Sequence, residues 1–305
     1  MNITVIGAGA MGSLFGGIMA ESGHDVKLLD IWADHVNAIN EKGLSIEYED
    51  QTRNISVKAF TSPDNIPESD LVIIFVKSSQ TADAAETAHK LLSDKGFILT
   101  LQNGMGNADI IADIADCAGV LAGTTSHGAT MLGPGRIRHA GRGATILGLW
   151  NKGDHETVGH IVKTMSMAGL ETYYNADIKK VIWEKLLVNV GINAITALTG
   201  IRNGQILDMK VTRELSEDAV REAMKVAMAL GIKVREDAAE YTLEIAEATA
   251  GNRSSMGQDV DNHRITEIGA INGAVVAAAD KLDIPVPVNK TLVALVETLQ
   301  AHYNG

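Results

Sequence analysis

Cysteine is almost absent from this sequence, because Cys117 is the single one among 305 residues. One cysteine cannot form an internal disulfide, and this composition is typical of proteins in a reducing cytosol. Basic residues are also in the minority, since 26 Lys and Arg stand against 38 Asp and Glu, for a net charge of −12. Nucleic acids and anionic membranes attract a basic face. The charge balance therefore argues against both as partners.

An unbroken hydrophobic run is missing from the start of the chain, although residues 1–20 carry no charge. Five glycines interrupt this stretch, and no basic residue precedes it. A signal peptide needs a positive start and an unbroken apolar middle, and a membrane-spanning helix needs more apolar length. We therefore expect a cytoplasmic protein without a membrane partner.

The first half of the chain alternates short apolar runs with helical patterns, which predicts βαβ units and a parallel sheet. The expected strands are Ile3–Ile6, Val26–Asp30, Leu71–Val76 and Phe97–Leu101, and the expected helices are Met11–Ser22, Ala33–Lys42 and Thr81–Ser93. Two runs, Leu44–Tyr48 and Ile55–Phe60, predict an inserted hairpin. Residues 120–149 predict short strands separated by glycine-rich turns.

After Tyr174 the strand signals give way to helix-period apolar spacing. The expected helices are Asp177–Thr199, Thr212–Leu230, Arg235–Gly251, Thr266–Leu282 and Asn289–His302. The predicted fold class is therefore α/β, with an α/β domain over residues 1–175 and an all-helical domain over residues 176–305. The apolar C-terminal helices leave room for a homodimer.

A glycine-rich motif follows the first predicted strand and opens the first predicted helix. Its G-x-G-x-x-G residues are Gly7, Ala8, Gly9, Ala10, Met11 and Gly12. In this context the pattern indicates a dinucleotide site, where the glycines allow a tight turn and close approach of a pyrophosphate, and the helix N-terminus attracts the phosphates. A glycine-rich turn without a ligand is the alternative.

Asp30 ends the second predicted strand, eighteen residues after Gly12. A carboxylate there accepts hydrogen bonds from the adenosine ribose and repels a 2′-phosphate, which favours NAD(H) over NADP(H). The alternatives are a helix cap and an NADP(H) site in which Lys27 or Arg53 pairs with the phosphate.

Two further polar residues, Lys77 and Asn103, follow other strands of the predicted parallel sheet. Because ligands bind at the carboxyl edge of such sheets, we expect both residues near the nicotinamide. Capping of the next helix could also explain Asn103.

A polar stripe crosses the first helix of the C-terminal half. Lys185, Asn189 and Asn193 are spaced i, i+4 and i+8 on one face, and residues 186–201 contain no charge. Buried amides and ammonium groups need partners, so the stripe predicts a wet or ligand-filled cleft, with a structural polar network as the alternative. Burial would lower the pKa of Lys185 and suit it to acid catalysis.

A second polar set lies further along the chain. Asn252 and Ser255 could bind a carboxylate, and Glu267 could bind a hydroxyl, although each taken alone is typical of a cap or a surface position. The nine histidines form no close-spaced ligand pair beside a carboxylate cluster, so we expect no metal site.

Taken in order, these residues resemble the ketopantoate reductase (2-dehydropantoate 2-reductase) family over nearly the whole chain. The resemblance rests on Gly7–Gly12, Lys77, residues 103–106 and 123–127, Lys185 with Asn189 and Asn193, Asn203-Gly204, residues 254–256 and Thr266-Glu267. It implies an N-terminal Rossmann-type dinucleotide-binding domain and a helical C-terminal domain.

The resemblance also implies roles for single residues. Lys185 would protonate the ketone oxygen during hydride transfer, and Asn103 would contact both the nicotinamide ribose and the substrate. The residues implied to hold the substrate's carboxylate and hydroxyl are Asn189, Asn193, Asn203 and Ser255, and those implied to line the cofactor and reaction centre are Lys77, Ala129 and Glu267.

One departure concerns the cofactor. NADPH-using members of the family typically carry Arg just after the second strand, where this chain has Asp30-Ile31-Trp32. The leading hypothesis is NAD(P)H-dependent reduction of a 2-keto acid, namely 2-dehydropantoate to D-pantoate in pantothenate biosynthesis. The alternatives are an NAD-dependent D-2-hydroxy acid dehydrogenase for another bulky 2-keto acid and a non-catalytic dinucleotide-binding sensor.

Overall fold

The computed structural model describes residues 1–115, 119–151 and 153–303, so Cys117 lies outside the described residues. The chain divides into two compact units. The first comprises residues 1–102 and 107–178, and the second comprises residues 103–106 and 179–305.

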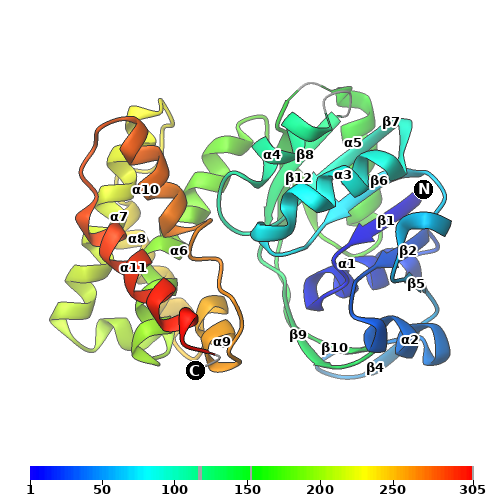
Figure 1. Cartoon of the computed structure of the whole chain (residues 1–305), viewed down its shortest axis with the longest axis horizontal. Coiled ribbons are helices and arrows are strands. Elements are labelled where there is room, and N and C mark those ends of the chain that lie inside the picture. Colours follow the sequence, from blue (N-terminus) through cyan, green and yellow to red (C-terminus); the bar gives the residue numbers. More distant parts are fainter. Residues whose placement is uncertain (116–118, 152, 304–305) are drawn as a thin grey trace. The chain divides into compact units, whose positions relative to one another are not determined.

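The main sheet of the first unit has eight strands in the order β12-β11-β8-β7-β6-β1-β2-β5. Its strands, drawn in Figure 1, are β1 (Asn2–Ile6), β2 (Asp25–Leu29), β5 (Lys58–Phe60), β6 (Ser69–Ile74), β7 (Leu92–Thr100), β8 (Gly119–Thr125), β11 (Thr145–Leu149) and β12 (Thr172–Tyr174). The six strands from β8 to β5 are parallel, whereas β11 runs antiparallel to β8. The predicted parallel sheet is therefore confirmed.

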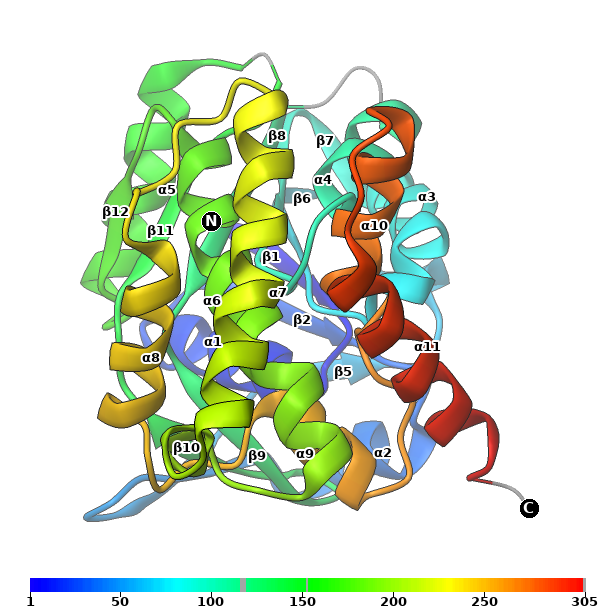
Figure 2. The same cartoon turned by 90° about the vertical axis from the view of Figure 1, so that its left-hand side faces the viewer.

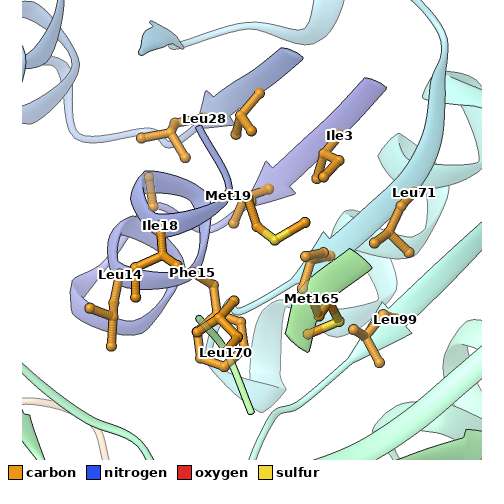
Figure 3. Packing of buried hydrophobic residues seen from close by; sticks show 14 of the residues in the cluster. Ile3, Leu14, Phe15, Ile18, Met19, Leu28, Leu71, Leu99, Met165 and Leu170 are labelled. Carbon is orange, nitrogen blue, oxygen red and sulfur yellow. The ribbon is translucent and has the colours of Figure 1, made fainter. Parts of the chain in front are cut away.

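Both faces of this sheet are buried, because successive side chains of a strand point to opposite faces. In β6, Leu71 and Ile73 join one hydrophobic cluster while Val72 and Ile74 join another. Helix α1 (Ala10–Glu21) covers the first of these faces, and Figure 3 shows its side chains against those of β1 and β2. Helices α3 (Thr81–Leu91) and α4 (Asn107–Ile114) supply the second cluster. Helix α5 (His155–Met167) packs on the α1 side.

A second sheet packs on α1, with the strand order β4-β3-β10-β9. Its strands are β3 (Leu44–Glu47), β4 (Thr52–Ile55), β9 (Gly128–Gly133) and β10 (Arg136–Gly141). A hairpin starting at Leu44 is present, but its second strand is β4, which lies mostly in the stretch predicted as the connection, so the predicted strand over Ile55–Phe60 is wrong. The chain instead leaves the hairpin after Ile55, and β5 pairs in parallel with β2 in the main sheet. Asn40 of α2 (Ala33–Lys42) fixes this separate strand by two hydrogen bonds to the Ala59 backbone.

The second unit is helical, as predicted. Its helices are α6 (Ile178–Thr199), α7 (Lys210–Ala229), α8 (Ala238–Ala248), α9 (Ser255–Asp261), α10 (Asn272–Lys281) and α11 (Pro287–Ala301), with a short 3₁₀ helix η3 (Asn203–Leu207). Figure 2 shows α7 beside α8, and α10 beside α11. The apolar side chains of α6 and α7 form the centre of this unit's core.

The prediction of a helix from Thr266 is wrong, because α10 begins at Asn272. The carbonyl of Ala270 accepts a hydrogen bond from the amide of Met105, and the amide and hydroxyl of Thr266 donate to Gln300. Within this segment the amides of Ala270 and Ile271 donate to the carbonyl of Glu267, so residues 266–271 form a turn before α10, which the long-range partners hold in place. Helix α9 was not predicted.

Helix α6 is the one helix among residues 1–115, 119–151 and 153–303 that is long and apolar enough to cross a membrane. Trp183, Leu187 and Val190 of this helix are at most 3% exposed and lie in the core of the helical unit. These contacts are those of a core helix, whose apolar length is explained by burial in protein.

A buried carboxylate joins two helices of this unit. Glu222 of α7 is 8% exposed and accepts hydrogen bonds from the backbone amides of Val288 and Asn289, both at 3.0 Å. It also accepts one from the Asn289 side chain at 2.8 Å. These amides belong to the first turn of α11, where backbone donors lack helical partners and the helix dipole favours a negative charge.

We predict that Glu222→Ala lowers the free energy of unfolding by about 2–4 kcal/mol, because the buried donors of α11 lose their acceptor. Glu222→Gln should lose less, since one carbonyl oxygen remains. The control is Glu214→Ala on the same helix, whose exposed pair with Lys210 should contribute less than about 0.5 kcal/mol. Urea unfolding followed by circular dichroism measures all three, and equal losses for Glu222→Ala and Glu214→Ala would contradict the capping role.

Candidate functional site

The glycine loop lies between β1 and α1, as predicted. Gly7 has φ +90°, and a Cβ added there would lie 2.7 Å from the amide nitrogen of Val76. A Cβ on Gly12 would lie 2.0 Å from the carbonyl oxygen of Gly7. Both positions therefore require glycine, one for backbone conformation and one for packing of the helix on the turn.

Gly9 is glycine for a different reason. It stands at the N-cap of α1, and nothing lies within 4 Å of the position that its Cβ would occupy. The loop is thus closed by protein at Gly7 and Gly12 and open at Gly9. Next to Gly9 are the amides of Ala10 and Met11, which have no intrahelical acceptor because they belong to the first turn of α1. An anionic group such as a pyrophosphate fits this open side.

Asp30 immediately follows β2, at the same sheet edge as the glycine loop. Its Oδ1 accepts a hydrogen bond from the amide of Trp32 at 2.9 Å, which orients the carboxylate. Ile31 is 83% exposed and offers no partner for a phosphate. The Trp32 ring stacks on His35, with centroids 5.3 Å apart.

Two other predicted cofactor residues lie in the first unit, in different places. Lys77 is exposed after β6, at the N-cap position of the 3₁₀ helix η2 (Ser78–Gln80) and at the carboxyl edge of the main sheet. Ala129 is half-buried in β9 of the second sheet, opposite His139 of β10. Lys77 therefore shares the edge of Gly7 and Asp30, whereas Ala129 belongs to the other sheet.

The second unit begins its site with the short segment 103–106. Gly104 has φ +84°, and a Cβ there would lie 2.3 Å from the carbonyl oxygen of Ala270. The amide of Met105 donates to the same carbonyl at 2.8 Å. The segment is thereby fixed against the loop 266–271. Helix α4 starts only at Asn107, so the interpretation of Asn103 as its cap is wrong.

Asn103 instead links the two candidate catalytic residues. Nζ of Lys185 donates to Oδ1 of Asn103 at 3.2 Å, and Nδ2 of Asn103 donates to Oε2 of Glu267 at 3.2 Å. Because an ammonium only donates and an ionised carboxylate only accepts, the asparagine amide has a single orientation that satisfies both. Lys185, Asn103 and Glu267 thus form one hydrogen-bonded chain.

The environment of Lys185 changes its acidity. Part of the side chain remains accessible, but the surrounding protein lowers its pKa from 10.5 to about 8 through desolvation of the ammonium. The charge of Glu267 acts in the opposite direction and raises this pKa. Near neutral pH the Lys185 side chain is therefore mostly in its protonated ammonium form, and this ammonium is a stronger acid than that of an ordinary lysine.

The polar stripe of α6 continues from Lys185 to Asn189, which is half-buried, and Asn193, which is 5% exposed. Beyond it, the hydroxyl of Thr196 forms a 2.7 Å hydrogen bond with Ser254, the N-cap of α9. Ser255 is the exposed first residue of α9. The structure thus brings the start of α9 to the far end of the stripe.

Asn203 and Asn252 are brought together by a backbone hydrogen bond of 3.0 Å. The side-chain amide of Asn203 donates to Thr249, while its buried Oδ1 has no hydrogen-bond partner among the described residues. Asn252 is exposed. An unsatisfied buried oxygen usually marks a missing polar partner such as water or a ligand.

One residue of this region, Gln300, was not singled out by the sequence analysis. Gln300, near the end of α11, accepts hydrogen bonds from both the amide and the hydroxyl of Thr266, at 3.1 and 3.0 Å, next to Glu267. No motif surrounds it, and only a three-dimensional contact reveals it.

For metals, the described residues contain no group of three or more His, Cys, Asp or Glu side chains placed to hold an ion.

Sequence comparison matches both units to one family. Residues 3–152 match the family described as "Ketopantoate reductase PanE/ApbA", and residues 177–300 match its C-terminal part. The chain is 39% identical over 301 residues to the 2-dehydropantoate 2-reductase of Halobacterium salinarum, covering 98% of this chain and 99% of that protein. It is 37% identical over 307 residues to that of Pyrococcus horikoshii, covering 100% and 99%.

Solved structures show the same similarity. A PanE/ApbA-family ketopantoate reductase from Ralstonia eutropha superposes with a TM-score of 0.93 at 31% identity, over the full length of both chains. D-mandelate dehydrogenase in complex with NADH and anilino(oxo)acetate superposes with a TM-score of 0.93 at 28% identity, also over both full chains. These similarities confirm the predicted fold class.

The lowered pKa of Lys185 has a consequence for stability. A depressed lysine pKa means that the folded state disfavours the charged form, a cost that is present below about pH 8 and disappears above pH 10.5. We predict that Lys185→Met raises the Tm by about 1–3 °C at pH 7. This gain should vanish at pH 11.

Thermal unfolding of Lys185→Met is compared with that of Lys225→Met, a control at an exposed position on α7 that should not change the Tm. A lower Tm for Lys185→Met at pH 7 would show that the charged lysine stabilises the fold instead.

Proposed function

Because the chain belongs to the ketopantoate reductase family, we propose that it is an oxidoreductase that reduces 2-dehydropantoate to D-pantoate with a nicotinamide cofactor. The observation that carries this proposal is the pair of hydrogen bonds that links Lys185 to Asn103 and Asn103 to Glu267. Burial at this site lowers the pKa of the lysine to about 8. A partly buried lysine of this acidity suits proton donation to a ketone oxygen. On this proposal the enzyme acts in the cytoplasm, in pantothenate biosynthesis.

The chemistry requires a hydride and a proton. A reduced nicotinamide, held by the residues of the glycine loop, would supply the hydride for the keto carbon, and the carbonyl oxygen would then need a proton. Lys185 holds a proton on Nζ and transfers it to this oxygen, which forms the hydroxyl of the product and leaves a neutral amine. Before transfer, the ammonium polarises the carbonyl. Asn103 orients Lys185, and Glu267 keeps it protonated by raising its pKa.

The polar residues beyond Lys185 suit the carboxylate and hydroxyl groups of the substrate. We assign the carboxylate and the hydroxyl of 2-dehydropantoate to the polar groups that follow Lys185 on α6 and at the start of α9. These are Asn189, Asn193, Asn203, Asn252 and Ser255. The buried Oδ1 of Asn203 supports this assignment, since it can accept a hydrogen bond from a substrate hydroxyl.

The glycine loop is the proposed pyrophosphate site, with Lys77 and Ala129 lining the cofactor. We propose NAD(H) as the preferred cofactor, because Asp30 orients a carboxylate where the adenosine ribose hydroxyls would bind. Ile31 beside it cannot pair with a 2′-phosphate. NADP(H) is the alternative, in which Lys27 or Arg53 pairs with the phosphate.

A second candidate function is NAD-dependent dehydrogenation of another bulky D-2-hydroxy acid. It is favoured by Asp30 and by the similarity to D-mandelate dehydrogenase, whose structure was solved with NADH. Comparing kcat/KM for 2-dehydropantoate with that for aromatic and branched 2-keto acids separates the two. A protein that binds the dinucleotide but reduces none of these acids would instead be a non-catalytic sensor.

We predict that kcat/KM for ketone reduction is constant below pH 8 and falls tenfold per pH unit above it, because only protonated Lys185 can donate. Lys185→Ala should lower kcat about 100- to 10,000-fold and leave the Kd for NADH nearly unchanged. Glu267→Gln should move the alkaline limb to lower pH, since the charge that raises the lysine pKa is removed.

Steady-state kinetics between pH 6 and 10 measure these effects, with the exposed Lys225→Ala as the control variant. An unchanged kcat in Lys185→Ala would exclude the lysine as the proton donor. An alkaline limb that moves to higher pH in Glu267→Gln would contradict the assigned role of Glu267.

For the cofactor, we predict a higher kcat/KM with NADH than with NADPH. The double variant Asp30→Ser, Ile31→Arg should reverse this preference and improve the NADPH value about 10- to 100-fold, because a charge-assisted hydrogen bond to the 2′-phosphate replaces a repulsion. Asp34→Ser, at an exposed position of α2, is the control. A wild-type enzyme that is faster with NADPH would overturn the interpretation of Asp30.

A further inference from the structure

A fully buried histidine lies behind the glycine loop. His35 stands on α2 and is 0% exposed, between the exposed Asp34 and the buried Val36. Both of its ring nitrogens have partners. Nδ1 lies 3.0 Å from the backbone nitrogen of Gly135, and Nε2 lies 3.1 Å from Oγ of Ser13. Trp32 stacks on the ring with planes 12° apart.

The partners determine where each proton lies. The Gly135 amide can only donate, so Nδ1 of His35 must accept, and a neutral ring then carries its proton on Nε2. Nε2 therefore donates to the Ser13 hydroxyl, and this hydroxyl in turn donates to the carbonyl of Ala8 at 2.7 Å. Three hydrogen bonds run in one direction from the Gly135 amide to the Ala8 carbonyl.

These three hydrogen bonds form a relay from Gly135 through His35 and Ser13 to Ala8, and its two ends lie in different parts of the unit. Ala8 is the second residue of the glycine loop and is itself fully buried. Gly135 lies in the turn between β9 and β10 of the second sheet, where its φ is +69°. His35 thus connects the loop to a sheet that contributes no residue to the glycine motif.

We propose that His35, as the neutral Nε2–H tautomer, is a positioning residue that holds the glycine loop, through Ser13 and Ala8, in the conformation that receives a dinucleotide pyrophosphate. This inference rests on the proposed function. Burial lowers the pKa of His35, and the charge of Asp30 opposes this with a smaller effect. The lowered pKa keeps the ring in the neutral form that the relay needs. A loop ordered before binding spends less of the binding energy on ordering itself.

Two substitutions divide the relay at the histidine. In His35→Asn, the side-chain oxygen reaches about as far as Nδ1 and keeps an acceptor for Gly135, but nothing reaches Ser13. In His35→Gln, the amide nitrogen reaches about as far as Nε2 and keeps a donor for Ser13, but the Gly135 amide loses its acceptor. Ser13→Ala removes the link to Ala8 directly. The matched control is His160→Asn, at an exposed position of α5.

We measure the Kd for NADH by fluorescence titration, the Tm without cofactor, and the hydrogen–deuterium exchange of residues 6–14 in the cofactor-free protein. His35→Asn and Ser13→Ala should raise the Kd about 3- to 10-fold and speed exchange in the loop, while kcat changes less than twofold. His35→Gln should keep the wild-type Kd and exchange rate, although its Tm falls as much as that of His35→Asn.

Equal effects of His35→Asn and His35→Gln on the Kd and on exchange would overturn the proposal, because they would reflect a general loss of stability. An unchanged Kd and exchange rate in Ser13→Ala would overturn it as well. If the wild-type protein binds neither NADH nor NADPH, the proposed function fails. The exchange measurement still decides whether His35 orders the loop.

Discussion

The cost of holding an ammonium group in a low-dielectric environment governs the candidate site. Lys185 lies on an apolar helix whose neighbouring side chains form the core, so its charge must be compensated locally. Asn103 and Glu267 supply this compensation, and neither lies on a regular helix or strand. The segment 103–106 and the loop 266–271 both leave regular structure, and the hydrogen bond from Met105 to Ala270 holds them together. The hydrogen-bonded partners of this one cation therefore come from two segments outside regular secondary structure.

Much of this site could be predicted from the sequence where the signal was local. The spacing of Lys185, Asn189 and Asn193 places them on one helix face, and the glycine loop between a strand and a helix has a form set by its own turn. The loop 266–271 was predicted as helix, because its apolar spacing continues that of α10. Its actual conformation depends on Met105 and on Gln300, 34 residues away from Thr266. The roles of the site residues in catalysis remain predictions.

The same distinction applies to the fold. Strand and helix positions in the α/β unit follow from local patterns of burial, and most were predicted correctly. The partner of a strand was not always predictable, since Ile55–Phe60 reads as one apolar run but is divided between two sheets. His35 is a similar case. A single histidine in a polar helix carries no signal, and its partner Gly135 lies 100 residues away.

The assignment of residues 103–106 to the helical unit has a consequence for how this protein can be divided. The polypeptide passes between the two units at residues 102/103, 106/107 and 178/179, so neither unit is one continuous stretch of sequence. A fragment cut at residue 179 would carry Lys185 and Glu267 but would lack the asparagine that joins them. Recombination with a related enzyme at this boundary would therefore separate a hydrogen-bonded chain and combine Asn103 of one parent with Lys185 of the other. Recombination that keeps this hydrogen-bonded set intact must therefore keep residues 103–106 together with residues 179–305.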